Sequence, residues 1–160
     1  MAPGEDGAAT AERLACLKAR CVAAGESLPV LGADTVVVCA GRVLGKPASA
    51  AEAADMLRLL SGRTHEVVTG LCVLAGGIAR SAVERTDVTF GPMGEQEIEW
   101  YAGTDEPLDK AGAYHVDGRG ALFITAISGS PSNVAGLPAR LLLRLAREAG
   151  LDLGLPAGPA

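Results

Sequence analysis

The chain has 160 residues, of which 49% are apolar and 3% aromatic, and its formal net charge is -5 at pH 7. This length predicts a single domain, and the scarcity of aromatic residues predicts a core built mainly from Ala, Val and Leu. The negative charge argues against a nucleic-acid polymer as a partner, because proteins that bind phosphate backbones are usually basic. It remains compatible with a single nucleotide held by a few local cations.

The cysteines and the N-terminus exclude two further classes. The four cysteines have no CxxC spacing and only two histidines accompany them, so a zinc site is not predicted. No signal sequence precedes the first expected helix, and no apolar run is long enough to span a bilayer. We therefore expect a cytoplasmic protein without a membrane partner.

The organisation along the chain is simple. Residues 1–9 are expected to be disordered, residues 10–150 to form the domain, and residues 151–160 to form a flexible tail rich in Gly and Pro. Thr10 is a candidate cap for a first helix that ends near Gly25. No internal repeat or low-complexity linker divides the domain.

The stretch from residue 28 to residue 47 carries the first chemical signal. Apolar runs at 28–33 and 35–39 predict two strands, separated by a bend that leaves Asp34 between them. A carboxylate placed between two strand segments is costly to bury unless it faces a polar cleft. A short hairpin then leads to Lys46. One carboxylate and one cation on neighbouring strands suit the activation of water beside a polyphosphate.

The middle of the chain is expected to contain a helix and a long hairpin. Ser49 and Glu52 form a capping box, which predicts the start of a helix that ends before Gly62. Alternating apolar residues then predict strands at 64–74 and 78–90, joined by a glycine turn.

The C-terminal half combines several short elements. Helices and strands do not alternate as regular βαβ units, so the sequence predicts a mixed α/β domain with flanking helices. The expected elements are a helix at 95–102, a polar loop at 105–112, strands at 114–116 and 121–127, a loop at 128–133 and a helix at 137–149.

Each candidate residue also has a purely structural interpretation. Asp34 suits a turn between strands, and Lys46 suits a solvated strand end. Lys110 with its neighbour Asp109 is typical of a surface ion pair, which contributes little to stability. Glu84 can point to solvent from its strand. The residues considered one at a time leave these alternatives open.

Six segments, taken in order, resemble the Maf family of nucleoside triphosphate pyrophosphatases. They are LPVLGADTVVV, GKP, AADMLRLLSGRTHEVVTG, VERTDVTF, EIEWYAGTDEPLDKAGAYHVDGRGALFI and NVAGLP, and the resemblance runs from about Arg13 to Arg147. It implies an elongated mixed sheet similar to that of inosine triphosphate pyrophosphatases, with a cleft between two lobes. It also implies hydrolysis of a nucleoside triphosphate to the monophosphate and pyrophosphate with a divalent metal cation, Mg²⁺ or Mn²⁺, and it suggests a homodimer.

The resemblance assigns roles to individual residues. Asp34 matches the general base. In the enzyme hypothesis, apart from these matches, Asp34 and Glu84 are the carboxylates expected to hold the divalent metal, because hard cations prefer oxygen ligands. The other matches are Lys46 and Lys110 as catalytic lysines of the cleft, and Lys18, Thr35 and Asp117 as substrate-binding residues. The Asp34-Thr35 pair resembles the branch that prefers dTTP and UTP. Asp117, however, stands where that branch carries Gln, and a carboxylate can only accept hydrogen bonds.

The chain lacks the family's opening strand with its motif S-x-S-P-R-R, so we expect an N-terminally truncated version of the fold. The leading hypothesis is a nucleoside triphosphate pyrophosphatase. The alternative is a truncated, catalytically weak or inactive homologue that acts as a nucleotide-binding or interaction module. A third explanation is that the sequence begins downstream of the protein's true start.

Overall fold

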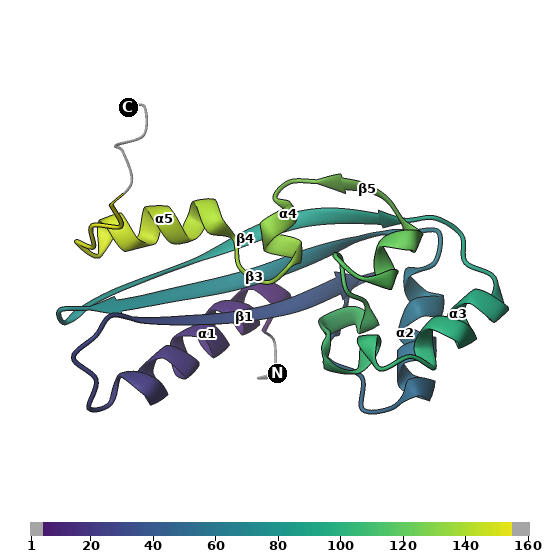
Figure 1. Ribbon diagram of the computed structural model, residues 1–160, viewed down its shortest axis with the longest axis horizontal. Helices are drawn as coiled ribbons and strands as arrows, with labels where there is room; N and C mark the ends of the chain where they lie inside the picture. Colours follow the sequence, from purple (N-terminus) through teal and green to yellow (C-terminus); the bar gives the residue numbers. More distant parts are fainter. Residues whose placement is uncertain (1–4, 155–160) are drawn as a thin grey trace.

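The computed structural model describes residues 5–154, and its centre is an antiparallel sheet with the strand order β2-β1-β3-β4-β5 (Figure 1). This arrangement confirms the predicted mixed α/β fold with an elongated sheet and flanking helices. The strands are β1 (Val30–Cys39), β2 (Arg42–Leu44), β3 (Thr64–Ala75), β4 (Ile78–Phe90) and β5 (Ile124–Ser128). The α-helices are α1 (Gly7–Ala23), α2 (Ala50–Leu60), α3 (Glu95–Ala102), α4 (Pro131–Val134) and α5 (Ala139–Glu148), and the 3-10 helices are η1 (Glu106–Asp109), η2 (Ala111–Ala113) and η3 (Arg119–Phe123).

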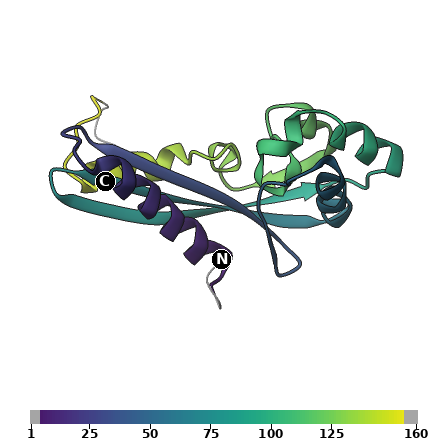
Figure 2. The ribbon, with the colours of Figure 1, turned by 90° about the horizontal axis from the view of Figure 1, so that it is seen from below.

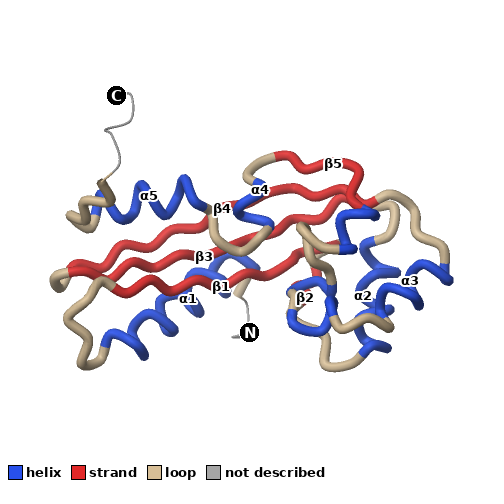
Figure 3. The backbone as a smooth tube through the Cα atoms, in the orientation of Figure 1, coloured by secondary structure: helices blue, strands red, loops and turns tan. Residues whose placement is uncertain are grey.

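The hairpin of β3 and β4 is the longest feature of the sheet. The two strands pair from Thr64 opposite Thr89 to Ala75 opposite Ile78. Both glycines of the intervening turn have positive φ, as a tight hairpin requires. Figure 3 shows that β1 follows this hairpin along most of its length, whereas β2 and β5 join the sheet at one end only. That end forms a second lobe with α2 and α3.

Helix α1 lies against one face of β1 and β3, close to the strands (Figure 2). Glycines of the sheet allow this approach. A Cβ atom on Gly70 would lie 2.5 Å from the backbone carbonyl oxygen of Ala11, and one on Gly32 would collide with that of Ala15. The close packing fixes α1 on the sheet and holds its Lys18 beside β1.

Helix α5 covers the opposite face of the sheet, over β3 and β4. Its Leu141 and Leu145 pack on Leu71 and Val73 of β3, whereas α1 packs on Cys72, the residue between them. Since successive side chains of a strand point to opposite faces, the two helices enclose the sheet from both sides.

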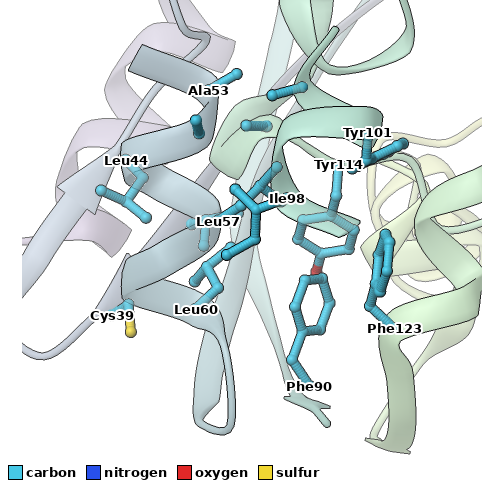
Figure 4. Packing of buried hydrophobic residues seen from close by; sticks show 14 of the residues in the cluster. Cys39, Leu44, Ala53, Leu57, Leu60, Phe90, Ile98, Tyr101, Tyr114 and Phe123 are labelled. Atoms are coloured by element: carbon cyan, nitrogen blue, oxygen red, sulfur yellow. The ribbon is translucent and has the colours of Figure 1, made fainter. Parts of the chain in front are cut away.

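The main core lies in the second lobe. Figure 4 shows Leu57 and Leu60 of α2 near Ile98 of α3, with the rings of Phe90 and Tyr114 beside them. All five side chains are buried. Burial of side chains of this size contributes about 1.5–3 kcal/mol each to stability, and this cluster therefore anchors the second lobe to the end of the sheet.

The expected disorder of residues 1–9 is wrong in its second half. Helix α1 begins at Gly7, because the carboxylate of Asp6 accepts the backbone N–H of Ala9 at 2.8 Å and caps the helix in place of Thr10. Residues 1–4 lie outside the described residues. Of the predicted tail, 151–154 contain no regular helix or strand, and 155–160 also lie outside the described part of the chain.

Three strand predictions are corrected as well. The bend expected before Asp34 is absent, because β1 pairs with β3 without interruption and Asp34 is opposite Gly70. The strand expected at 114–116 is a turn region, and the strand expected at 121–127 begins only at Ile124. For the strands expected at 114–116 and 121–127, tertiary contacts override the local pattern, because the rings of Tyr114 and Phe123 pack against rings from other segments.

The outer edge of β1 is open over most of its length. Strand β2 pairs only with Val37–Cys39, so within residues 5–154 the stretch 30–36 has a strand partner on its β3 side alone.

No helix within residues 5–154 is long and apolar enough to cross a membrane.

Candidate active site

A cavity of about 300 Å³ opens where the edge of β1 meets the second lobe. This volume is at the lower end of the range for small-molecule sites. The sequence contains three lysines, Lys18, Lys46 and Lys110, and all three line the cavity. Every other basic side chain of Lys or Arg type in the chain is an arginine. The cavity therefore contains all the primary amines that side chains of this protein can offer.

The carboxylate of Asp34 lies at the β1 wall of the cavity and is paired with Lys18. The Lys18 Nζ atom donates to Asp34 Oδ1 at 2.5 Å and to the backbone carbonyl of Ala33 at 3.3 Å. The side chain of Asp34 is 14% exposed, and that of Lys18 is 58% exposed. Among the described residues, only Oδ1 of Asp34 has a hydrogen-bond partner, so Oδ2 is free to bind a ligand or to accept a proton.

Asp34 and Thr35 reach the cavity from opposite faces of the sheet. Asp34 is opposite Gly70 and shares the α1 face, whereas Thr35 is opposite Thr69 and shares the α4 face. Both line the cavity, because no strand covers this edge of β1 within residues 5–154. The open edge is thus what brings the two neighbouring side chains into one site.

A buried hydrogen-bond network fixes the wall next to Thr35. The hydroxyls of Thr35 and Thr69 lie 2.9 Å apart, and Thr69 donates to the backbone carbonyl of Asn133 at 3.2 Å. The fully buried Asn133 amide donates in turn to the carbonyl of Val67 and to the hydroxyl of Thr86. These bonds tie α4 to three strands, and the residues that follow Asn133 form part of the cavity wall.

Lys46 and Lys110 come from segments that are tied together by the backbone. The N–H of Gly112 donates to the carbonyl of Gly45 at 3.0 Å. Gly45 directly precedes Lys46, and Gly112 lies two residues after Lys110. Lys110 Nζ donates to Asp109 Oδ1 at 2.8 Å. The hydrogen bond from Lys110 and the charge of Lys46 lower the pKa of Asp109. Lys46 has no ion-pair partner among the described residues, so the cavity carries an excess positive charge.

The structure does not bring Glu84 or Asp117 into the cavity. Glu84 lies on β4 opposite Thr69, on the other face of the sheet from Asp34, so the two carboxylates expected to share a metal do not face each other. Asp117 is exposed, and it is His115 that lines the cavity in this segment. Within residues 5–154, no group of three or more His, Cys, Asp or Glu side chains is arranged to hold a metal ion.

Sequence reasoning missed residues that act on the site through distant contacts. Glu106 accepts hydrogen bonds from backbone N–H groups of the turn that follows His115. The hydroxyl of Tyr101 in α3 donates to Glu106 and accepts the backbone N–H of His115. Tyr114 lines the cavity and bonds through its hydroxyl to His65 Nε2 at 2.9 Å. Local spacing gives no signal for such pairs, because their partners lie between five and almost fifty residues apart in the sequence.

Comparison with known proteins is consistent with this arrangement. The family model described as "Maf-like protein" matches residues 2–149. A dTTP/UTP pyrophosphatase of Anaeromyxobacter dehalogenans (strain 2CP-C) is 50% identical over 155 residues, which cover 94% of this chain and 78% of the relative. The protein of the same name from Moorella thermoacetica is 52% identical over 149 residues, which cover 91% of this chain and 77% of the relative. A match along almost the whole chain, together with relatives this similar, means that the protein belongs to the Maf family.

Proposed function

We propose that this protein hydrolyses a nucleoside triphosphate, with dTTP and UTP as preferred substrates, to the nucleoside monophosphate and pyrophosphate. The observation that carries the proposal is the gathering of Asp34 and all three lysines of the chain around one cavity. The names of the relatives, dTTP/UTP pyrophosphatase, supply the substrate class.

In the proposed reaction, Asp34 acts on the attacking water. Oδ2 of Asp34, which is free among the described residues, accepts a proton as the water oxygen forms a bond to the α-phosphorus. The bond from the α-phosphorus to the oxygen that bridges to the β-phosphorus breaks, and pyrophosphate leaves with that oxygen. Lys18 holds Oδ1 at 2.5 Å and thereby orients the carboxylate.

The lysines stabilise the charge that develops on the phosphoryl oxygens. Lys46, the lysine without an ion-pair partner among residues 5–154, is available to a phosphate without breaking a contact. Lys110 can exchange Asp109, whose side chain is 70% exposed, for a phosphate oxygen. An ammonium group with rotatable donors can follow the phosphate through the reaction more easily than a planar guanidinium can.

A divalent cation fits this cavity only together with the substrate. Mg²⁺ is often bound by one or two carboxylates plus phosphate oxygens, and the cavity offers two carboxylates, Asp34 and Asp109. Because the described residues contain no larger acidic cluster, we propose Asp34, and not Glu84, as the protein ligand. When bound, the cation would neutralise charge on the polyphosphate.

Selection of the base is proposed to involve Thr35 and the wall around His115 and not the exposed Asp117. Thr35 is held by Thr69, and its position therefore depends on the buried network behind it. We also propose that the protein acts on a free nucleotide pool in the cytoplasm. A homodimer, as the family resemblance suggests, belongs to the same proposal.

The test is a comparison of two Asp-to-Asn variants. Asp34→Asn keeps the shape of the side chain but removes the proton acceptor, so release of pyrophosphate from dTTP should fall by at least about 100-fold. The melting temperature should change little. Asp87→Asn, an exposed carboxylate of β4 outside the cavity, is the matched control and should keep full activity.

The same experiment separates the enzyme from a module that only binds nucleotides. If the parent protein binds dTTP but releases no pyrophosphate, and Asp34→Asn leaves binding unchanged, the binding-module hypothesis replaces the proposed reaction. Activity of Asp34→Asn within a few-fold of the parent would remove Asp34 from the role of general base.

A further inference from the structure

A carboxylate outside the cavity organises one of its walls. Oε2 of Glu106 accepts the backbone N–H of Arg119 at 3.0 Å, and Oε1 accepts the backbone N–H of Gly120 at 3.0 Å. Burial acts to raise the pKa of Glu106, but these bonds and the one from Tyr101 outweigh it, so the pKa lies below the usual value. Glu106 is therefore ionised at neutral pH and accepts at both oxygens.

Tyr101 joins this carboxylate to the start of the same turn. Its hydroxyl donates to Glu106 Oε1 at 2.7 Å and accepts the backbone N–H of His115 at 3.1 Å. The side chain is fully buried. Burial and the bond to Glu106 raise the pKa of Tyr101, so the hydroxyl keeps the proton that it donates. We call Glu106 and Tyr101, with their bonds to residues 115–120, the clasp.

The glycines of the turn fit closely against the clasp. A Cβ atom on Gly118 would lie 2.5 Å from Glu106 Oε1, and one on Gly120 would lie 2.7 Å from the Tyr101 hydroxyl. A side chain at Gly118 would displace the Glu106 carboxylate, and one at Gly120 would collide with the backbone of His115 as well. The turn is thus packed against the Glu106 carboxylate at Gly118 and against the Tyr101 hydroxyl at Gly120.

The clasp acts on the cavity through the first residues of the turn. His115 and Val116 line the cavity, and the N–H of His115 is held by Tyr101. The clasp residues themselves do not line it. Asp34 lies on β1 and Lys46 follows β2, elements that the clasp does not contact through these bonds, whereas Lys110 follows η1, the element that carries Glu106.

We propose that Glu106 and Tyr101 are positioning residues that hold residues 115–120 in the form that presents His115 and Val116 to the nucleoside part of the substrate. This proposal rests on the proposed function, because it assigns the wall to substrate recognition. It predicts that loss of the clasp weakens and broadens substrate recognition while the chemical step at Asp34 continues.

The experiment compares five variants with the parent protein. Glu106→Ala in η1 and Tyr101→Phe in α3 each remove one part of the clasp, and Gly118→Ala disturbs the clasp from the turn. Glu106→Gln is the rescue variant, because the amide oxygen can still accept the bonds from Gly120 and Tyr101. Glu99→Gln, an exposed position on α3 outside the cavity, is the charge-matched control.

Two readouts are measured for each variant. For Glu106→Ala, KM for dTTP and UTP should rise about tenfold or more with kcat within about threefold, because the wall loses hydrogen bonds to a charged group that hold it in place. The ratio of kcat/KM between dTTP and the other common triphosphates should move toward one. Hydrogen exchange should show loss of protection at the amides of Arg119 and Gly120, with Glu106→Gln in between and Glu99→Gln unchanged.

The two readouts distinguish failure of the clasp from failure of the proposed function. Unchanged exchange at Arg119 and Gly120 in Glu106→Ala overturns the clasp. Lost protection with unchanged KM and unchanged substrate ratios overturns its role in recognition. A parent protein that hydrolyses no triphosphate contradicts the proposed function and with it that role, whereas exchange still reports whether the clasp holds the turn.

Discussion

At the scale of single residues, the burial of one histidine makes the stability of the protein depend on pH. His65 is 2% exposed, bonds to Tyr114 through Nε2, and has no partner for Nδ1 in the described structure. Burial lowers its pKa to about 4, compared with about 6.5 for an unperturbed histidine. The ring is therefore neutral in the folded protein at pH values where the unfolded chain already takes up a proton.

This difference predicts acid sensitivity with a defined sign. Stability from His65 is fully present above about pH 6.5 and is lost as the pH falls from there toward 4, by roughly 3 kcal/mol in total. Urea unfolding of the parent and of His65→Gln at pH 7.5 and pH 5 isolates the contribution. The parent should lose more stability than the variant between these two values, and equal losses would mean that His65 does not titrate as its burial implies.

At the scale of elements, the close packing of α1 on the sheet determines the position of Lys18. The helix approaches so closely at Gly70 that a Cβ atom there would lie 2.5 Å from backbone atoms of Ala11 and Glu12. Backbone cannot move aside as a flexible side chain can, so the helix as a whole must shift. Because Lys18 lies two turns further along α1, its bond to Asp34 is the contact most directly exposed to such a shift.

Gly70→Ala should therefore weaken both the fold and the site. Overpacking of this kind costs about 1–3 kcal/mol, and the activity should fall further than the stability loss explains at temperatures where the variant is still folded. Gly94→Ala is the control, because its Cβ would meet its nearest neighbour, Glu97, at an ordinary 3.5 Å. Thermal unfolding and pyrophosphate release, measured on both variants, test the prediction. A Gly70→Ala protein with parental activity would show that α1 does not set the geometry of Asp34.

The elements also show what a sequence can and cannot reveal. The N-cap at Ser49 and the glycine turn of the β3–β4 hairpin were predicted correctly, because their signals lie within a few residues of each other. The second half of the expected capping box differs, since Glu52 accepts the backbone N–H of Ala48 and not that of Ser49. The region 114–127 was not, because Tyr114 and Phe123 are placed by rings from distant segments. The same limit applies to the site: the local residues pointed to Asp34 and Lys46, and the family resemblance added Lys18 and Lys110, but Glu106 bonds over thirteen residues and leaves no local pattern.

At the scale of the whole molecule, lysines and arginines occupy different parts of the protein. The three lysines line one cavity, and arginine is the basic residue everywhere else in the sequence. Several of those arginines form exposed ion pairs, such as Arg58 with Glu95 and Arg144 with Glu148, which contribute little to stability. Although the chain has a net charge of -5, an anion that enters this cavity meets all three lysine amines.

This distribution of lysines and arginines predicts a selective pattern of chemical modification. An amine-directed acylating reagent should modify only the three lysines and the N-terminal amine of the folded protein, because no other primary amine exists in the chain. Pyrophosphate or a nonhydrolysable analogue of dTTP should protect all three lysines and leave the N-terminal amine reactive, if the polyphosphate lies among them. Arginine modification by a dicarbonyl reagent is the control and should not change with either ligand. Peptide mass spectrometry gives the extent of reaction at each site. Protection of only one lysine would place the polyphosphate away from the other two, and protection of none would remove the cavity from phosphate binding altogether.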